Sequence, residues 1–233
     1  MTRNDASFGQ AAIVSTTPIL VNEPVAVALL DLIGSVEAPG GYNQRYAEPS
    51  SGPFKYDLIN MSINDVIDLP ANKPRGKVAS TASGRYQFLS TTLRSVKDKL
   101  NLTGDEHFDP PMQDRLAYQL LINRGYERWK QGEITDIAFG KNIAQEWASF
   151  PVLADTVRNG KTIKAGGSYY GGDGTNKALV STDQVYRALR AMSATKEPPP
   201  MPPPPDIEPP TPRPEPRTLW EIVVAFLAWI AGK

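Results

Sequence analysis

The chain has 233 residues, of which 40% are hydrophobic and 21% are charged, a composition that fits a folded domain with one buried core. Its 25 basic and 25 acidic residues cancel, so no net charge points to nucleic acid as a partner. The absence of cysteine excludes disulfides, thiolate nucleophiles and cysteine-bound zinc, and the single histidine, His107, leaves little material for histidine-based catalysis.

The first predicted helix places an acidic residue beside a break in the chain. Residues 1–21 show no apolar period and are expected to form an irregular leader. Asn22-Glu23-Pro24 is typical of a helix start, with asparagine as N-cap and an acid and a proline in the first turn. An apolar stripe of helical spacing follows and ends at Ala38-Pro39-Gly40-Gly41. Glu37 is therefore predicted to lie in the last turn of a core helix.

The middle of the chain predicts an α+β domain that is mostly helical. Residues 41–77 are rich in Gly, Pro, Asn and Ser, and we expect long loops with a small β-hairpin there. The segment 84–87 is predicted to be a strand. Further helices are predicted to begin at Ser90, Asp109-Pro110, Thr135 and Ser181-Thr182. Together with the first helix, these elements define a predicted domain over residues 22–195, with a small β-sheet region beside its cleft.

The composition changes after this domain. Residues 196–217 are dominated by proline and are predicted to form an extended linker. Residues 218–233 follow as a short apolar tail with Trp220 and Trp229, side chains that favour the interface of a membrane. The apolar run from Leu219 to Ala231 is shorter than the ~20 residues that a spanning helix needs. We therefore expect a tail that associates with a membrane or binds a partner.

A carboxylate at the end of a core helix suits the cleavage of a glycosidic bond, because the leaving oxygen needs a proton. Most glycosidases use two carboxylates, one as acid and one as base or nucleophile. The glycan of peptidoglycan permits another route, in which the 6-hydroxyl of N-acetylmuramic acid (MurNAc) attacks its own C1. A single carboxylate then suffices, first as acid and then as base, and an apolar setting that raises its pKa favours this role. Glu37 is the candidate.

Two downstream segments offer groups that could hold sugars. In the segment Ser83–Gln87, Ser83, Arg85 and Gln87 supply hydrogen-bonding groups, and Tyr86 supplies a flat face for a sugar ring. The glycine-rich loop 166–174 carries Tyr169 and Tyr170 and is predicted to form a lip of the groove.

An earlier segment, Tyr56-Asp57, is a further candidate for substrate binding. Asp57 could serve as the second carboxylate if the bond is hydrolysed by water rather than by the 6-hydroxyl. The residues alone leave both routes open.

These blocks in this order resemble the lambda-type phage endolysins, which are lytic transglycosylases with a lysozyme fold, over about Val25 to Met192. The landmarks of the resemblance are 34–37, 56–57, 80–87, 123–125, 147–151 and 170–171. The resemblance implies a lysozyme-like α+β fold and cleavage of the bond between MurNAc and N-acetylglucosamine (GlcNAc), with no metal or cofactor. It also implies that Glu37 is the sole catalytic acid and that Tyr86, Gln87 and Tyr170 lie in or near the sugar groove.

The chain departs from that family in two places. The family has Ser-Glu-Gly-Thr at the acid, where this chain has Val36-Glu37-Ala38-Pro39. The segment 158–167, and the proline-rich linker with its apolar tail, have no counterpart in the compact family member. These additions favour a relative that is tethered to a membrane or a particle.

Two alternatives remain at this stage. The first is a hydrolytic muramidase (lysozyme) with a water nucleophile. The second is a virion-associated protein with a wall-binding or structural role and a membrane-active tail. Under each of these three hypotheses (transglycosylase, muramidase and virion-associated protein) the expected partner is the peptidoglycan glycan strand. A membrane surface or a virion protein is the expected partner of residues 218–233. The first residues, Met1 to Ser7, show no signal-peptide pattern. We therefore expect synthesis in the bacterial cytoplasm and access to the wall through a holin or in a virion.

Overall fold

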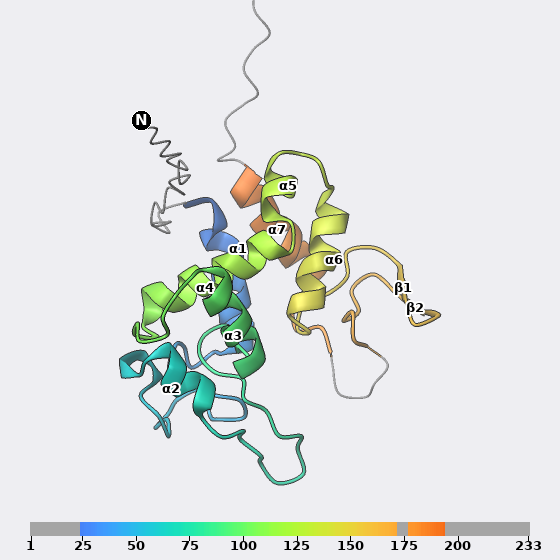
Figure 1. Ribbon diagram of the computed structural model, residues 1–233. Coiled ribbons are helices and arrows are strands. Elements are labelled where there is room, and N and C mark those ends of the chain that lie inside the picture. Colours follow the sequence, from blue (N-terminus) through green and yellow to red (C-terminus); the bar gives the residue numbers. More distant parts are fainter. Residues whose placement is uncertain (1–23, 172–176, 194–233) are drawn as a thin grey trace, which may run out of the picture. The chain divides into compact units, whose positions relative to one another are not determined.

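The computed structural model of the protein describes residues 24–171 and 177–193 (Figure 1). The predictions for the leader, the proline-rich linker and the apolar tail lie outside the described residues. The α-helices of the described part are α1 (Pro24–Glu37), α2 (Ile63–Asp68), α3 (Ser90–Lys99), α4 (Pro110–Asn123), α5 (Tyr126–Lys130), α6 (Asp136–Glu146) and α7 (Thr182–Ser193). A 3₁₀-helix, η1 (Leu58–Asn60), and two strands, β1 (Thr156–Arg158) and β2 (Lys161–Ile163), complete the set.

Most of the predicted helix starts are confirmed, and side-chain caps explain them. In three of the predicted helices the residue before the first turn accepts a hydrogen bond from the backbone N–H three positions later, which satisfies one of the unpaired donors of a helix start. The pairs are Asp109 with Met112 at 2.9 Å, Thr135 with Ala138 at 3.2 Å, and Ser181 with Gln184 at 3.2 Å. α3 begins at Ser90 as expected, but Leu89 occupies the N-cap position, so Ser90 is not the cap.

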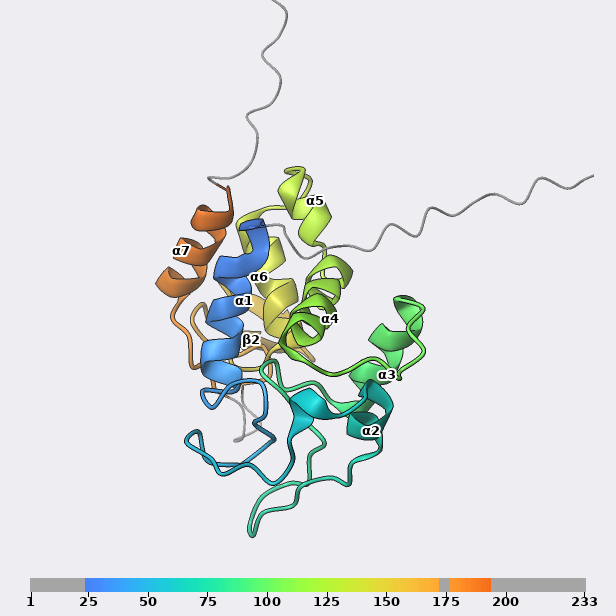
Figure 2. The same ribbon diagram turned by 90° about the vertical axis from the view of Figure 1, so that its left-hand side faces the viewer.

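The end of α1 is fixed by the core. Helices α1 and α7 lie side by side in both views (Figures 1 and 2). Leu29 and Ile33 of α1 and Val185 and Leu189 of α7 are fully buried. Each such side chain contributes roughly 1.5–3 kcal/mol to folding when it leaves water. The last turn of α1, which carries Glu37, is therefore held by a well-packed helix.

The predicted strand over residues 84–87 is wrong, because this segment is a tight turn. Ser83 and Phe88 pair across it through two backbone hydrogen bonds of 3.0 Å. Gly84 and Gln87 both have positive φ, +78° and +50°. Glycine adopts such a φ without steric cost, whereas a strand needs extended backbone at every position. The turn leaves Gln87 at its end, next to the start of α3.

The sheet lies elsewhere than predicted. β1 and β2 form an antiparallel hairpin within residues 156–163, whereas residues 41–77 contain α2 and η1 and no strand. The hairpin predicted within 41–77 is therefore wrong. Helices with a small two-stranded sheet nonetheless confirm the α+β class of a lysozyme-like fold. Within the described ranges, no helix is long and apolar enough to cross a membrane.

Candidate active site

Glu37, the last residue of α1, has a partly buried carboxyl group with one protein partner. The Ser149 hydroxyl, from the segment after α6, donates a hydrogen bond to Glu37 Oε1. Burial raises the pKa of the Glu37 carboxyl above its usual value, and the Ser149 hydrogen bond opposes part of that rise. No other described residue hydrogen-bonds to the Glu37 side chain, so Oε2 is left for another partner.

A cavity of about 310 Å³ lies against Glu37. Its wall combines aromatic side chains with a few polar ones, as sugar-binding clefts do. The aromatic residues are Tyr86, Phe88, Trp147 and Tyr170, and the polar ones include Gln87, Thr92, Gln145 and Glu146. The structure therefore brings together four of the predicted site residues, Glu37, Tyr86, Gln87 and Tyr170.

Gln87 is oriented by its own turn. Its Nε2 donates to the carbonyl oxygens of Gly84 at 2.9 Å and Gln44 at 3.2 Å. Its Oε1 accepts no hydrogen bond from any described residue. The amide is thus fixed at its nitrogen end, and its oxygen is available to an N–H or O–H donor in the cavity.

Tyr86 forms part of the cavity wall from a buried position. Its hydroxyl donates to Asp114 Oδ1 at 2.6 Å, and Asp114 also accepts from the Tyr42 hydroxyl at 2.9 Å. Burial and the Asp114 carboxylate raise the pKa of Tyr86, and the same two causes raise the pKa of Tyr42 to about 12. The Trp147 indole donates to the Tyr86 carbonyl at 3.2 Å. With 2% of its surface exposed, Tyr86 supports the turn more than it offers an open ring.

Tyr170 lies in the cavity wall and is held at both ends. Its hydroxyl donates to the Gln145 carbonyl at 2.7 Å, and the Arg158 guanidinium of β1 lies 4.5 Å from its ring centroid. Tyr169 packs edge-on against it, with the ring centroids 5.4 Å apart, but does not line the cavity. The β1–β2 hairpin thus reaches the site through Arg158.

Ser83 and Arg85 do not line the cavity either. The Ser83 hydroxyl is buried, donates to Thr81 O at 2.9 Å and accepts from Arg45 Nε at 3.2 Å. Arg85 forms an ion pair with Asp31 at 3.0 Å. Both side chains have structural partners around the turn.

Tyr56 and Asp57 also lie outside the lining of this cavity. The guanidinium of Arg45 lies 5.1 Å from the Tyr56 ring centroid. Asp57 is exposed and accepts hydrogen bonds from Asn43 at 3.1 Å and Asn60 at 2.7 Å, at the start of η1. These contacts are typical of a turn-forming aspartate.

Two residues of the site, Ser149 and Glu146, carry no signal in the sequence that would assign them a role. Ser149 lies within the block 147–151, which carried the resemblance, but no role was assigned to it. Glu146 ends α6, and its carboxylate pairs with Arg124 Nε at 2.7 Å. It is the second carboxylate in the cavity wall. The long sequence separation of both residues from Glu37 leaves no local pattern that would link them to it.

Comparison with known families identifies the chain. The model of a family described as Endolysin matches residues 27–176, well over half of the sequence and all of the cavity lining. Searches of curated proteins and of solved structures gave no match. The chain therefore belongs to the endolysin family and is an enzyme that degrades the peptidoglycan of the bacterial cell wall.

Proposed function

We propose that this endolysin cleaves the MurNAc–GlcNAc β-1,4 bond as a lytic transglycosylase, with Glu37 as the only catalytic acid and base. The observation that carries the proposal is the difference between the surroundings of the two carboxyl groups in the cavity wall, those of Glu37 and Glu146. Burial raises the pKa of Glu37, which favours the protonated form that a general acid needs. The Glu146 carboxylate is instead held in an ion pair with Arg124 Nε at 2.7 Å.

The reaction follows from this difference. Glu37 donates its proton to the glycosidic oxygen as the bond from C1 of MurNAc to that oxygen breaks. The 6-hydroxyl of the same MurNAc attacks C1, and its proton passes to the Glu37 carboxylate. The products are a 1,6-anhydroMurNAc end and a free GlcNAc hydroxyl, and Glu37 is protonated again. No water is consumed, and no metal or cofactor is required.

Ser149 supports both halves of this cycle. It donates to Oε1, which leaves Oε2 as the oxygen that carries and transfers the proton. The same hydrogen bond stabilises the carboxylate that exists between the two proton transfers. Burial thus favours the protonated acid, and the hydrogen bond from Ser149 favours the release of its proton.

Hydrolysis is the second candidate, and Glu146 is the observation that favours it. A muramidase needs a carboxylate that activates water or attacks C1, opposite the acid. Glu146 lines the same cavity as Glu37, whereas Asp57 does not. The hydrolytic route would therefore use Glu146 as the second carboxylate, in place of the Asp57 expected from sequence.

Release of soluble sugar from purified peptidoglycan tests the proposal. Glu37→Gln keeps the shape of the side chain and removes the transferable proton, so we expect release to fall by about 10²–10⁴-fold. Asp57→Asn, the matched control, should stay within about threefold of the unmodified protein. Equal losses in Glu37→Gln and Glu146→Gln would favour hydrolysis. Undiminished release by Glu37→Gln would overturn both routes.

A further inference from the structure

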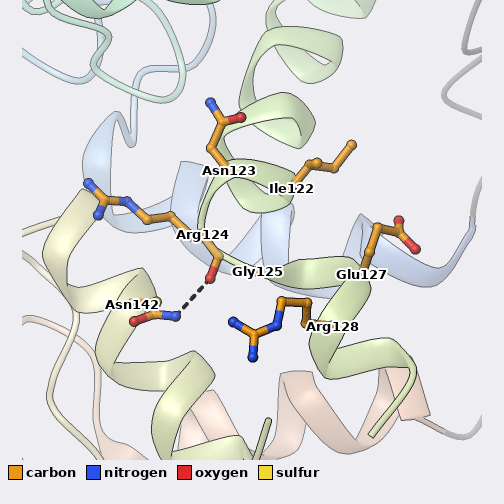
Figure 3. A pocket seen from close by; sticks show the side chains of 7 residues that line it. All are labelled: Ile122, Asn123, Arg124, Gly125, Glu127, Arg128 and Asn142. Atoms are coloured by element: carbon orange, nitrogen blue, oxygen red, sulfur yellow. Dashed lines mark hydrogen bonds between the residues drawn. The ribbon is translucent and has the colours of Figure 1, made fainter. Parts of the chain in front are cut away.

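The cavity beside Glu37 does not end at the catalytic residue. A second hollow of about 360 Å³ shares Thr92, Leu120 and Glu146 with it. A third hollow of about 300 Å³ shares Asn123 and Arg124 with the second (Figure 3). We call the second and third hollows together the α4 groove, since both follow the last turns of α4. The shared residues place the groove next to the cavity.

The α4 groove differs chemically from the cavity. The cavity wall has four aromatic side chains, which suit the faces of sugar rings, and the α4 groove has none. Its lining instead combines charged groups such as Arg124, Glu127 and Arg128 with the side-chain amides of Asn123 and Asn142. Such groups recognise carboxylates and amide bonds, the functional groups of a peptide.

Two arginines of the α4 groove have N–H groups that no described residue accepts. Arg124 uses its Nε for Glu146 at 2.7 Å, and Arg128 uses its Nε for Glu133 at 3.1 Å. The terminal nitrogens of both guanidinium groups have no hydrogen bond to any residue in the described ranges. In Figure 3 the Arg128 guanidinium lies on the side of Asn142, whose Nδ2 donates to the Arg124 carbonyl at 2.9 Å. Guanidinium groups bind carboxylates through paired N–H donors, so each arginine can hold one carboxylate of a ligand. Glu127 and Glu146 place two carboxylates in the same lining, so the groove presents charges of both signs.

We propose that the α4 groove binds the peptide stem of peptidoglycan, which is attached to the lactyl group of the MurNAc whose bond is cut. The inference rests on the proposed function, because it places that MurNAc in the cavity beside Glu37. The stem is a short peptide with free carboxylates, which matches the arginines and amides of the groove.

The dimensions agree with such a ligand. Leu120 lies where the cavity meets the groove, and Arg124 lies where the two hollows of the groove meet. The two residues are four positions apart in α4, which is about 6 Å along the helix at 1.5 Å per residue. A stem of four residues spans up to about 14 Å when extended. It can therefore start at a sugar in the cavity and reach both hollows.

Binding of defined ligands to the full-length Glu37→Gln protein tests the inference without cleavage. The ligands are a GlcNAc–MurNAc tetrasaccharide with tetrapeptide stems and the same tetrasaccharide without them, each titrated by calorimetry. We expect the stem-bearing ligand to bind about tenfold more tightly or better, or 1.4 kcal/mol. Arg124→Gln and Arg128→Gln, each added to Glu37→Gln, should bring the ratio of the two dissociation constants close to one. Arg75→Gln, an exposed arginine outside all three hollows, should leave the ratio unchanged.

The outcomes separate this inference from the proposed function. Equal constants for the two ligands, or a ratio that neither arginine variant alters, would overturn the peptide site and leave the sugar site intact. Absence of binding by both ligands would overturn the proposed function and this inference with it. Two separate arginine variants keep the test decisive should Arg124→Gln fail to fold.

Discussion

At the scale of single residues, the proposed reaction depends on a carboxyl group whose surroundings oppose its ionisation. Glu37 is partly buried at a helix end and has one hydrogen bond, from Ser149. Burial and this hydrogen bond act in opposite directions on its pKa, and burial is the larger effect. In the proposed reaction, their balance sets the pH range in which Glu37 can donate its proton.

Ser149→Ala should therefore shift the pH profile of cleavage. In the proposed reaction Glu37 acts as an acid in its protonated form, so activity should fall as pH rises through its pKa. The hydrogen bond from Ser149 lowers that pKa, and its loss should move the alkaline limb of kcat/KM to higher pH. We also expect kcat to fall by about 10- to 150-fold, because the Glu37 carboxylate formed during the reaction loses a charge-assisted hydrogen bond of roughly 1.5–3 kcal/mol. An alkaline limb at unchanged pH would contradict the role assigned to Ser149.

The Glu37 carboxyl group should also lower the stability of the folded protein at neutral pH. Since the pKa of Glu37 is raised in the folded state, the native protein binds more protons than the unfolded chain between the unfolded pKa and the folded one. Its contribution to stability is fully present below about pH 4.3 and is lost as pH rises through the folded pKa. Glu37→Gln should therefore have a higher Tm than the unmodified protein at pH 7, and this difference should shrink towards pH 4. Equal Tm differences at both pH values would contradict the raised pKa.

Glu37 could be predicted from the sequence because its signal is local. The apolar stripe of α1 and the break at 38–41 lie next to it in the chain. Ser149 and Glu146 could not be assigned in the same way. Ser149 meets Glu37 across 112 positions, and only the packing of α1 against the rest of the domain brings the two together.

At the scale of elements, the turn between Ser83 and Phe88 positions one wall of the site. Gln113 of α4 accepts from the Arg85 backbone N–H at 2.9 Å and donates to the Phe108 carbonyl at 2.8 Å. The turn is thus held against α4 by a buried amide. Gly84 makes this possible, because its φ is positive and a Cβ there would lie 2.3 Å from Gln113 Oε1.

Gly84→Ala should destabilise the protein by about 2–4 kcal/mol, the sum of the strain at positive φ and the collision with a buried side chain. Gly76→Ala is the matched control, since Gly76 has nearly the same φ, +76°, but nothing within 4 Å of its added Cβ. We expect Gly76→Ala to lose only the stability that the strain at positive φ costs, about 1–2 kcal/mol. Urea unfolding measures both, and equal losses would show that Gln113 does not hold the turn.

The sequence predicted long elements better than short ones. The helices that begin at Asp109 and Thr135 carry a cap and several turns of apolar period, which together specify a helix. At 84–87 the sequence resembles a strand, because the aromatic residues Tyr86 and Phe88 alternate with polar ones, but the segment forms a turn. α2 and the β1–β2 hairpin are too short to show a period, so tertiary contacts decide their conformation.

At the scale of the whole molecule, the described site is contained in one compact unit. The cavity and the α4 groove are lined by residues between Glu37 and Tyr170, and the described residues all belong to the unit Met1–Lys196. The proline-rich linker and apolar tail expected after it remain predictions.

Deletion of residues 197–233 should leave the cleavage of purified, membrane-free peptidoglycan within about twofold of the full-length rate. The reason is that every residue assigned to the reaction precedes the deletion. A full-length variant with Trp220→Ala and Trp229→Ala serves as the control for the tail. Sugar release measures the effect, and a loss of tenfold or more in the truncated protein would place part of the catalytic machinery in the tail.

Mass spectrometry of the fragments that the full-length protein releases from purified peptidoglycan tests the central claim most directly. We predict fragments ending in 1,6-anhydroMurNAc, which are one water lighter than hydrolysis products, and none from Glu37→Gln assayed in parallel. Reducing MurNAc ends would contradict the transglycosylase route and direct attention to Glu146 as a second carboxylate. Release that does not depend on Glu37 would contradict the account as a whole.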